Sequence, residues 1–287
     1  MSFVTRFAPS PTGFLHRGHA FSALSAQAAA RAEGGRFLLR VEDIDLTRCR
    51  PEYEQGVYDD LAWLGLEWEE PVRRQSAHFD EYRGALDQLI ARGLVYRCFK
   101  TRREILDEIA RAPHGPGEGP EGAIYRGQPL SPADEAALLA EGRPYAWRLS
   151  LDRAQETVGG WEALTFTEAG EGPLGETGVI QARPETAGDV VLARKDVGVA
   201  YHLAAVFDDA LQGVSHVVRG QDLFEATHIQ RLLQALLDLP TPRYRHHPLL
   251  TDAQGRRFAK RDRAESLREL RARGVSPREL RAELGFD

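Results

Sequence analysis

Residues 6 to 19 read Arg6-Phe-Ala-Pro-Ser-Pro-Thr-Gly-Phe-Leu-His-Arg-Gly-His19, an apolar run that turns through Pro and Gly into a His-x-Gly-His sequence. The preceding residues, Phe3 to Ala8, are predicted to form a strand. The Ala-rich run Ala20 to Glu33, which two glycines follow, predicts a helix. A helix N-terminus presents unpaired N–H groups and a partial positive charge. A strand that leads into a helix at this point therefore predicts a phosphate-binding turn.

The rest of the first ninety residues also alternates between strand and helix patterns. Arg36 to Val41 is predicted to be a short apolar strand, and Pro51 to Leu64 and Phe79 to Arg92 are predicted to be helices that end at glycines. The alternation resumes later in the chain, in the segments Asp189–Arg194, Ala200–Asp208, Val214–Arg219, Leu223–Leu237 and Tyr244–Leu250. This pattern predicts an α/β fold built from βαβ units around a parallel sheet.

The middle of the chain is less regular, and we predict that Tyr96 to Thr186 forms an insertion. Pro113 to Gly122 is rich in Pro and Gly and is predicted to be a loop, as is the Gly-rich stretch Thr167 to Pro184. Between them, Ser131 is predicted to cap a helix and Tyr145 to Leu151 to form a strand. Two short basic helices are predicted at the C-terminal end.

The composition is that of a globular protein, with 42% hydrophobic and 28% charged residues in a chain of 287. No apolar run approaches the roughly 20 residues that cross a bilayer, so we expect a cytoplasmic protein without membrane contact. The two cysteines, Cys49 and Cys98, suggest no disulfide framework. The net charge of −6 gives no overall basic footprint for nucleic acid.

The C-terminal segment differs from the rest of the chain in charge. From Gln254 to Asp287 it holds ten Lys or Arg and six Asp or Glu. Such a local basic surface can bind a phosphate backbone even on an acidic protein. It also fits a solvated helix face laced with salt bridges, and the sequence alone leaves both interpretations open.

Polar residues follow two of the predicted strands. Glu42-Asp43-Ile44-Asp45 comes directly after the strand 36–41, at the rim where α/β sheets bind ligands. One of these carboxylates is suited to an ammonium group, although capping, solvation and Mg²⁺ binding are alternatives. Arg219 ends a Val-rich strand, where a guanidinium is suited to a carboxylate and Tyr201 could add a hydroxyl. Arg219 could equally pair with one of three nearby acids, Asp208, Asp209 and Asp222.

Two further elements are suited to phosphate. His16 and His19 lie three residues apart and share one face of the predicted helix, where imidazoles can bind phosphoryl oxygens, and Gly18 allows close approach of a nucleotide. The basic loop Gly255 to Asp262 follows the last predicted strand and could neutralise a triphosphate. Taken alone, these motifs also fit capping histidines and an ordinary charged surface loop.

Four motifs in a fixed order make the chain resemble the catalytic core of the class I glutamyl-tRNA synthetases. They are Arg6 to Gly13 with Leu15 to His19, then Arg40-Val-Glu-Asp-Ile-Asp45, then Val218-Arg-Gly-Gln-Asp222, and finally Arg257-Phe-Ala-Lys-Arg261 at the place of the lysine-rich KMSKS loop. The resemblance spans nearly the whole chain. It implies a Rossmann-like parallel sheet with an α+β insertion and a short C-terminal helical segment.

The same resemblance divides the chain into domains. Residues 1–95 and 187–255 would form a split catalytic domain, 96–186 the insertion, and 256–287 the KMSKS-like loop with the C-terminal helices. Only 27 residues follow Lys260, so we expect no anticodon-binding domain. In this respect the chain resembles the shortened members of the family, the glutamyl-queuosine tRNA(Asp) synthetases.

The resemblance to those shortened members implies a reaction and its partners. L-glutamate would be activated with ATP and Mg²⁺, without tRNA, to glutamyl-adenylate. Glutamate would then be transferred to the queuosine base in the anticodon stem-loop of tRNA(Asp). We expect the enzyme to be a monomer.

Carried over residue by residue, the resemblance implies two binding sites. The glutamate site would comprise Arg6, Phe7, Ala8, Pro9, Ser10, Glu42, Tyr201 and Arg219. The ATP site would comprise His16, Gly18, His19 and Lys260. Of these, both histidines and the lysine would be catalytic.

The chain departs from the family pattern in three respects. Some relatives bind zinc in the insertion through Cys-x-Cys, a Tyr and a further Cys. Here Cys98-Phe99-Lys100 holds one thiol, Tyr125 remains, and Gln128 lies near the expected last Cys, so neither structural zinc nor another metal site is expected. In the KMSKS-like loop a Lys and a Ser are replaced by Arg257 and Ala259. His202 stands where relatives often have Asn.

Other functions remain as alternatives. One is a glutamyl-tRNA synthetase-like enzyme that charges a tRNA 3′ end, and another is a nucleotidyltransferase that forms an adenylate without tRNA. The non-catalytic alternative is a pseudo-synthetase that binds RNA. The intact set of residues favours an enzyme of the synthetase family: His16, His19, Glu42, Arg219 and Lys260.

Overall fold

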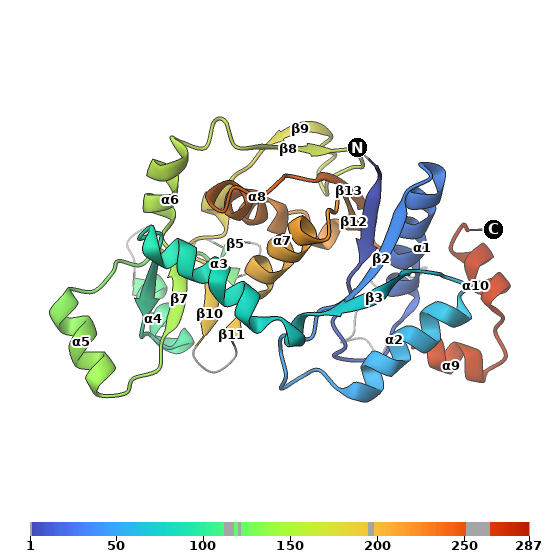
Figure 1. Cartoon of the computed structure of the whole chain (residues 1–287), viewed down its shortest axis with the longest axis horizontal. Helices are drawn as coiled ribbons and strands as arrows, with labels where there is room; N and C mark the ends of the chain where they lie inside the picture. The colour runs from blue at the N-terminus through green and yellow to red at the C-terminus, as the bar shows by residue number, and fades with distance from the viewer. Residues whose placement is uncertain (1, 112–117, 120–121, 195–197, 251–264, 287) are drawn as a thin grey trace.

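The computed structural model describes residues 2–111, 118–119, 122–194, 198–250 and 265–286, which form an α/β fold (Figure 1). The N-terminal part runs through β1 (Val4–Phe7), α1 (Arg17–Ala32), β2 (Arg36–Val41), α2 (Pro51–Trp63) and β3 (Glu69–Arg74). These three strands form a parallel sheet in the order β1-β2-β3. Parallel neighbours need crossover connections, which α1 and α2 supply.

A second set of parallel strands lies beside β1. β12 (His216–Gly220) pairs in parallel with β13 (Arg243–His247), and α8 (Ala226–Leu236) connects the two strands. β8 (Thr165–Glu168) also pairs in parallel with β13. β9 (Gly178–Gln181) adds an antiparallel edge. β12 lies against β1, and Ser215 N donates to Val4 O at 3.0 Å. The carboxyl ends of β1, β2 and β12 therefore meet at one edge, where α/β sheets bind ligands.

Another sheet is antiparallel, in the order β11 (Gly198–Val199), β10 (Val191–Arg194), β7 (Ala146–Leu149) and β4 (Val95–Cys98). The helices near it are α3 (Phe79–Ala91), α4 (Arg102–Arg111), α5 (Pro132–Ala140), α6 (Leu151–Val158) and α7 (Tyr201–Leu211). The remaining elements are η1 (Gln75–Ala77), η2 (Pro184–Thr186), η3 (Gln221–Leu223), β5 (Glu118–Gly119), β6 (Gly122–Ala123), α9 (Leu267–Ala272) and α10 (Pro277–Glu283). Figure 1 shows α5 at one end of the molecule and the C-terminal helices α9 and α10 at the other.

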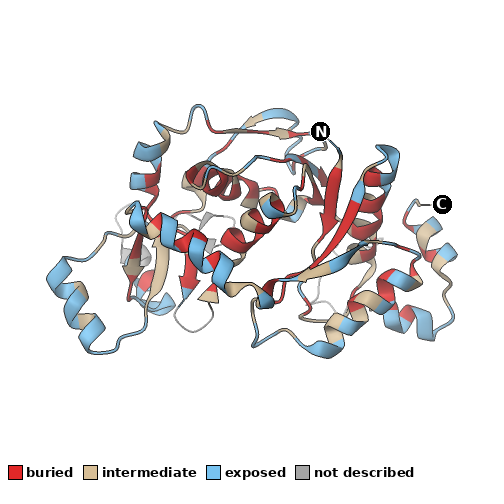
Figure 2. Cartoon of the chain, viewed as in Figure 1, coloured by how far each residue is buried: buried red, intermediate tan, exposed pale blue. Residues whose placement is uncertain are grey.

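Apolar side chains form two large buried clusters, and Figure 2 colours the buried residues of the chain red. One includes Leu149 and Leu232 and joins α3, α6, α7 and α8 to the strands between them. The other includes Leu61, Leu267 and Leu280 and joins α1, β2 and α2 to the C-terminal helices. Burial of these leucines holds α9 and α10 against the N-terminal βα units.

Most of the regular elements follow the sequence prediction. The predicted strand Arg36 to Val41 is β2, and the strands predicted at 3–8 and 214–219 correspond to β1 and β12. α1 begins earlier than predicted, at Arg17, because His16 caps its first turn. β3 was not predicted, since the charged run Glu69–Arg74 lacks an apolar strand pattern.

The prediction of a loop from Thr167 to Pro184 is wrong in part. β8 extends into it and β9 lies within it, with Thr167 opposite Val179. The two strands pair with each other, and β8 also pairs with β13, where Tyr244 lies opposite Glu168. A local Gly-rich composition gives no signal of a partner so far along the chain.

The domain division stays a prediction. Sheet pairing crosses both of its boundaries, because β7, within 96–186, pairs with β4 on one side and with β10 on the other. Among the residues that the structure describes, no helix combines the length and the apolar character needed to cross a bilayer.

Candidate active site

The His-x-Gly-His sequence forms the cap and first turn of α1. His16 Nδ1 accepts from Gly18 N at 3.1 Å, and His16 N donates to His19 Nδ1 at 3.2 Å. The two imidazole rings lie 3.8 Å apart between centroids. A neutral imidazole whose Nδ1 accepts a hydrogen bond carries its proton on Nε2. The turn therefore combines a helix N-terminus with two imidazole donors, a composition suited to phosphate.

The segment that carries the predicted basic loop begins and ends near this turn. His247, at the end of β13, packs edge-on against Phe21 of α1 with 5.0 Å between ring centroids. After the segment, Leu267 N donates to Leu15 O at 2.8 Å. Lys260 and the rest of the loop lie outside the described residues, so their place in the site stays a prediction.

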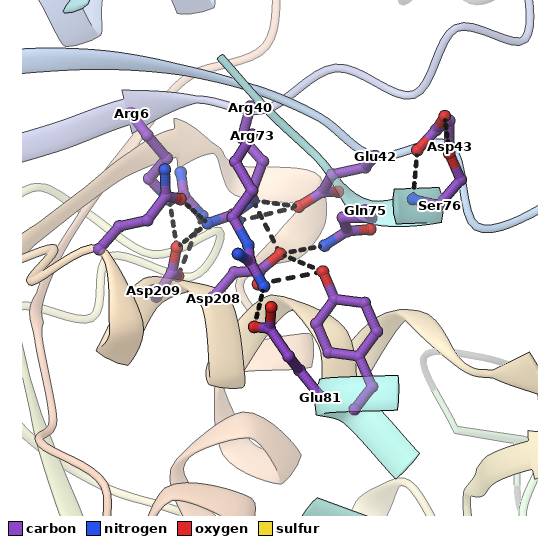
Figure 3. A network of polar contacts seen from close by, with 12 residues as sticks. Arg6, Arg40, Glu42, Asp43, Arg73, Gln75, Ser76, Glu81, Asp208 and Asp209 are labelled. Carbon is purple, nitrogen blue, oxygen red and sulfur yellow. Dashed lines mark hydrogen bonds and ion pairs between the residues drawn. The ribbon is translucent and has the colours of Figure 1, made fainter. Parts of the chain in front are cut away.

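Arg6, in β1, is held by a carboxylate from α7. Its Nε donates to Asp209 Oδ1 at 2.9 Å and its Nη2 to Oδ2 at 3.4 Å. Asp209 Oδ1 also accepts from Arg40 Nη1 at 2.7 Å, and Arg40 Nη2 donates to Glu42 Oε1 at 2.9 Å. Burial opposes ionisation of Asp209, but the two guanidinium groups outweigh it and lower its pKa to about 2. Arg6 and Glu42 are thus connected through Arg40 and Asp209 (Figure 3).

The neighbouring Asp208 is the centre of a second polar network, also drawn in Figure 3. Its carboxylate accepts from Arg73 Nε at 2.6 Å, from Gln75 Nε2 at 2.9 Å and from the Tyr82 hydroxyl at 2.9 Å. Arg73 Nη2 also donates to Glu81 at 2.6 Å. Because a buried carboxylate needs such partners, these contacts fix α7 relative to β3, η1 and α3.

Glu42 and Tyr201 both lie close enough to Arg6 for its charge to affect their pKa values. Glu42 is buried, and burial raises its pKa against the opposing effect of the guanidinium groups around it. Burial and the Glu42 carboxylate raise the pKa of Tyr201, whereas Arg219 and Arg6 act in the opposite direction. The structure therefore brings together Arg6 of β1, Glu42 after β2, Tyr201 of α7 and Arg219 of β12.

Residues 7–10 continue from β1 toward the His-x-Gly-His turn. Pro9 O accepts from Glu42 N at 3.0 Å, which ties this segment to the end of β2. Ser10 O accepts from Thr12 N at 2.8 Å, and Ser10 Oγ lies 3.8 Å from Cys49 Sγ. Phe7 and Pro9 are buried, and the segment joins the Arg6 group to the N-terminus of α1.

Arg219, in β12, is buried among neutral acceptors. Its Nε donates to His246 Nε2 at 3.0 Å and its Nη1 to Gln230 Oε1 at 2.9 Å. Its Nη2 donates to Thr227 Oγ1 at 2.7 Å and to Leu223 O at 3.0 Å. Over the described ranges, none of the three aspartates considered from the sequence binds Arg219 directly.

The other acids after β2 have structural partners. Asp43 Oδ1 accepts from Ser76 N at 2.8 Å and its Oδ2 from Ser76 Oγ at 2.6 Å. Asp45 Oδ1 accepts from Thr47 Oγ1 at 2.6 Å. The Asp45 contact is local, whereas Asp43 binds a residue 33 positions further along the chain. In the part of the chain that the structure describes, no group of three or more His, Cys, Asp or Glu residues is placed to hold a metal ion.

Sequence reasoning gave no role in the site to Arg40, Asp209, His246 or Glu168. Arg40 could have been found, because it is a charged residue inside an apolar strand and is fully buried. Asp209 was considered only as a partner of Arg219. Glu168 lies in the segment that was predicted to be a loop, so no pattern indicated that its side chain was buried.

Comparisons with known proteins identify the family of the chain. Residues 2–285 match the family described as tRNA synthetases class I (E and Q), catalytic domain. A glutamyl-Q tRNA(Asp) synthetase of Rhodobacter capsulatus is 48% identical, over 99% of this chain and 100% of the relative. A glutamate–tRNA ligase of Prochlorococcus marinus is 37% identical, over 96% of this chain and 56% of the relative.

A solved structure of a glutamate tRNA ligase has a similar fold. The glutamate tRNA ligase of Elizabethkingia meningosepticum, crystallised in complex with its amino acid, superposes with a TM-score of 0.73 at 26% identity. The match covers 91% of this chain and 52% of that one. The chain therefore belongs to the class I tRNA synthetases of the glutamate and glutamine group, through their catalytic domain, and is a ligase.

Proposed function

We propose that this ligase activates L-glutamate with ATP, without tRNA, and transfers it to the queuosine of tRNA(Asp). The observation that carries glutamate as substrate is the grouping of Arg6, Glu42 and Arg219 at the carboxyl ends of β1, β2 and β12 with Tyr201, the first residue of α7. The choice of tRNA rests on similarity, because identity is 48% to a glutamyl-Q tRNA(Asp) synthetase and 37% to a glutamate–tRNA ligase.

In the proposed glutamate site, each charged group of the amino acid has a partner of opposite charge. The two guanidinium groups of Arg6 and Arg219 would receive its two carboxylates, and Glu42 would receive its ammonium group. The Tyr201 hydroxyl and the backbone of residues 7–10 would complete the site. The buried Arg40–Asp209 bridge supports this role, since it fixes Arg6 relative to Glu42 before any ligand binds.

The proposed ATP site is the first turn of α1. His16 and His19 would donate from Nε2 to phosphoryl oxygens, Gly18 would let the nucleotide approach the backbone, and Lys260 would neutralise the phosphates from the opposite side. A glutamate α-carboxylate oxygen would attack the α-phosphorus in line. The bond to that oxygen forms as the bond to pyrophosphate breaks, so catalysis consists of positioning and charge stabilisation.

Metal ions enter this proposal only with the substrate. Mg²⁺ would accompany ATP, held by phosphate oxygens and water. We expect no structural zinc in the insertion. Cys98 and Tyr125 lie in a small buried cluster with Tyr96 and Ile105, and the Lys100 ammonium lies 5.8 Å from the centre of the Tyr125 ring, where it would repel a cation.

In the transfer step, a hydroxyl of the queuosine cyclopentenediol would attack the carbonyl carbon of glutamyl-adenylate. An ester bond to the base forms and AMP leaves. The partners of the enzyme would therefore be L-glutamate, ATP and the tRNA(Asp) anticodon stem-loop, and we expect it to act as a monomer in the cytoplasm.

The test is charging with labelled glutamate, using tRNA(Asp) with and without queuosine and tRNA(Glu) as acceptors. We expect label only on queuosine-containing tRNA(Asp), and glutamate-dependent ATP–pyrophosphate exchange in the absence of any tRNA. Charging of tRNA(Glu) at its 3′ end would favour the glutamyl-tRNA synthetase alternative. A lack of exchange with glutamate in every condition would favour a pseudo-synthetase.

A further inference from the structure

Arg219 differs from the other buried arginines of the site in its partners. Its four hydrogen bonds go to an imidazole, an amide, a hydroxyl and a backbone carbonyl, all of them neutral. By contrast, Arg6 and Arg40 each bind a carboxylate directly. These four bonds leave one N–H of Nη1 that no described residue engages. Its charge is thus held in place without being neutralised by direct contact.

The imidazole of His246 is itself fixed by a carboxylate. Its Nδ1 lies 2.6 Å from Glu168 Oε2, and since its Nε2 accepts from Arg219, the ring proton is on Nδ1 and is donated to Glu168. Glu168 Oε1 accepts from the backbone N of His246 at 2.9 Å and of Gly170 at 2.7 Å. Burial lowers the pKa of His246 to about 4, with Arg219 acting in the same direction and Glu168 in the opposite one, so the ring is neutral at neutral pH.

The backbone around Glu168 is shaped for this contact. β8 pairs with β13 so that Glu168 lies opposite Tyr244, two residues before His246. The turn after β8 passes very close to β13, because a Cβ atom at Gly170 would lie 2.3 Å from His246 O. Glu168 and His246 are both almost fully buried, with exposed fractions of 1% and 2%. The pair is therefore preorganised and excluded from water.

We propose that His246 is a positioning residue for substrate recognition, which presents the Arg219 guanidinium to a carboxylate of the bound amino acid while Glu168 fixes its tautomer. The inference rests on the proposed glutamate site and adds two residues to it. A neutral acceptor orients Arg219 through Nε but leaves its charge available. A carboxylate in the same place would compete with the ligand for that charge.

The test compares four variants with the wild type in ATP–pyrophosphate exchange, with KM measured separately for glutamate and for ATP. His246→Ala removes the acceptor, and we expect the KM for glutamate to rise about tenfold or more with little change in the KM for ATP. His246→Gln places an amide oxygen near the position of Nε2 and should restore most of the affinity for glutamate.

Glu168→Gln tests the tautomer directly. The amide that this substitution introduces can donate to Nδ1 of His246, which favours the tautomer of His246 that carries its proton on Nε2. That Nε2–H would face the Nε–H of Arg219 and could not accept from it, so the KM for glutamate should rise although the side chain at position 168 keeps its shape. His228→Gln is the matched control, because His228 is a buried histidine of α8 whose Nδ1 accepts from Arg183 N rather than from Arg219. It should leave the ratio of the two KM values unchanged.

The outcomes separate the two proposals. If the wild type exchanges but His246→Ala leaves the glutamate KM unchanged or raises both KM values equally, the positioning role is wrong and the proposed function stands. The positioning role is also wrong if His246→Gln has the same KM for glutamate as His246→Ala and both variants unfold cooperatively in a thermal melt. Should His246→Ala not fold, Glu168→Gln and His246→Gln decide in its place. A wild type that shows no exchange with glutamate overturns both proposals.

Discussion

Asp209 binds Arg6 with both of its carboxylate oxygens, and the oxygen that accepts from Arg6 Nε at 2.9 Å also accepts from Arg40 at 2.7 Å. Arg40 in turn binds Glu42. One carboxylate of α7 therefore fixes the distance between Arg6 of β1 and Glu42, which follows β2. In the proposed site this is the distance between a carboxylate partner and the ammonium partner of the same glutamate molecule.

Asp209→Asn should weaken both the fold and the site. The change leaves Arg6 and Arg40 buried beside a neutral amide, and breaking a buried ion pair in this way costs about 3–5 kcal/mol. We expect a loss of this size in the free energy of unfolding measured with urea, together with a rise in the KM for glutamate. Asp107→Asn, on the exposed face of α4, is the control and should change neither quantity. Unchanged stability of Asp209→Asn would mean that the bridge does not hold the site.

His16 has two separable roles, as the N-cap of α1 and as a proposed phosphate ligand. His16→Ala removes both, while His16→Asn keeps a side-chain acceptor for Gly18 N. We expect His16→Ala to lower stability by about 1 kcal/mol and His16→Asn to lower it less. Both should slow exchange about a hundredfold, because both lose the imidazole donor. If His16→Asn exchanges at the wild-type rate, the residue acts only as a cap.

Lys260→Ala should slow glutamate activation without affecting the fold. The proposed role of this lysine is to neutralise phosphates in the transition state, so we expect kcat for exchange to fall at least about tenfold. Its melting temperature should match that of the wild type. Lys100→Ala, at an exposed lysine that pairs with Glu108, is the matched control. Wild-type exchange by Lys260→Ala would remove this residue from the ATP site.

Asp60→Asn should stabilise the protein at neutral pH. Burial raises the pKa of Asp60 to about 6, and in the described part of the chain its Oδ2 has no hydrogen-bond partner. The folded state therefore binds the proton of the Asp60 carboxyl more tightly than the unfolded chain does. The contribution of this protonation to the free energy of unfolding is fully present below about pH 4 and is lost as the pH rises through 6.

The variant should therefore gain about 2 kcal/mol at pH 8 and nothing near pH 4, which thermal melts at both pH values would measure. The exposed Asp87→Asn is the control for the loss of a negative charge from a helix. A gain of equal size at both pH values would show that the effect does not come from the ionisation of Asp60.

The sequence predicted the elements whose signals are local. The apolar run Arg36–Val41, the Ala-rich helix with its glycine stop, and the Val-rich strand before Arg219 each carry their pattern within a few residues. The motifs at the ends of these strands could also be placed, because the carboxyl ends of parallel strands meet at one edge of the sheet. The candidate residues of the glutamate site came from the family resemblance that these motifs carry.

The contacts themselves depend on residues far apart in the chain. The sequence left three aspartates open as partners of Arg219. Asp209 instead binds Arg6, 203 positions away, and Arg219 binds His246. Glu168 lies in a Gly-rich stretch that predicts a loop, because nothing in its local composition indicates that its strand pairs with β9 and β13. Composition and periodicity describe the chain over a few residues. The packing of α7, β13 and β8, by contrast, determines which polar side chain each buried charged group contacts. The sequence thus determined which chemical groups the proposed site contains, and the tertiary structure decided that the guanidinium of Arg6 binds a carboxylate of the protein whereas that of Arg219 binds only neutral groups.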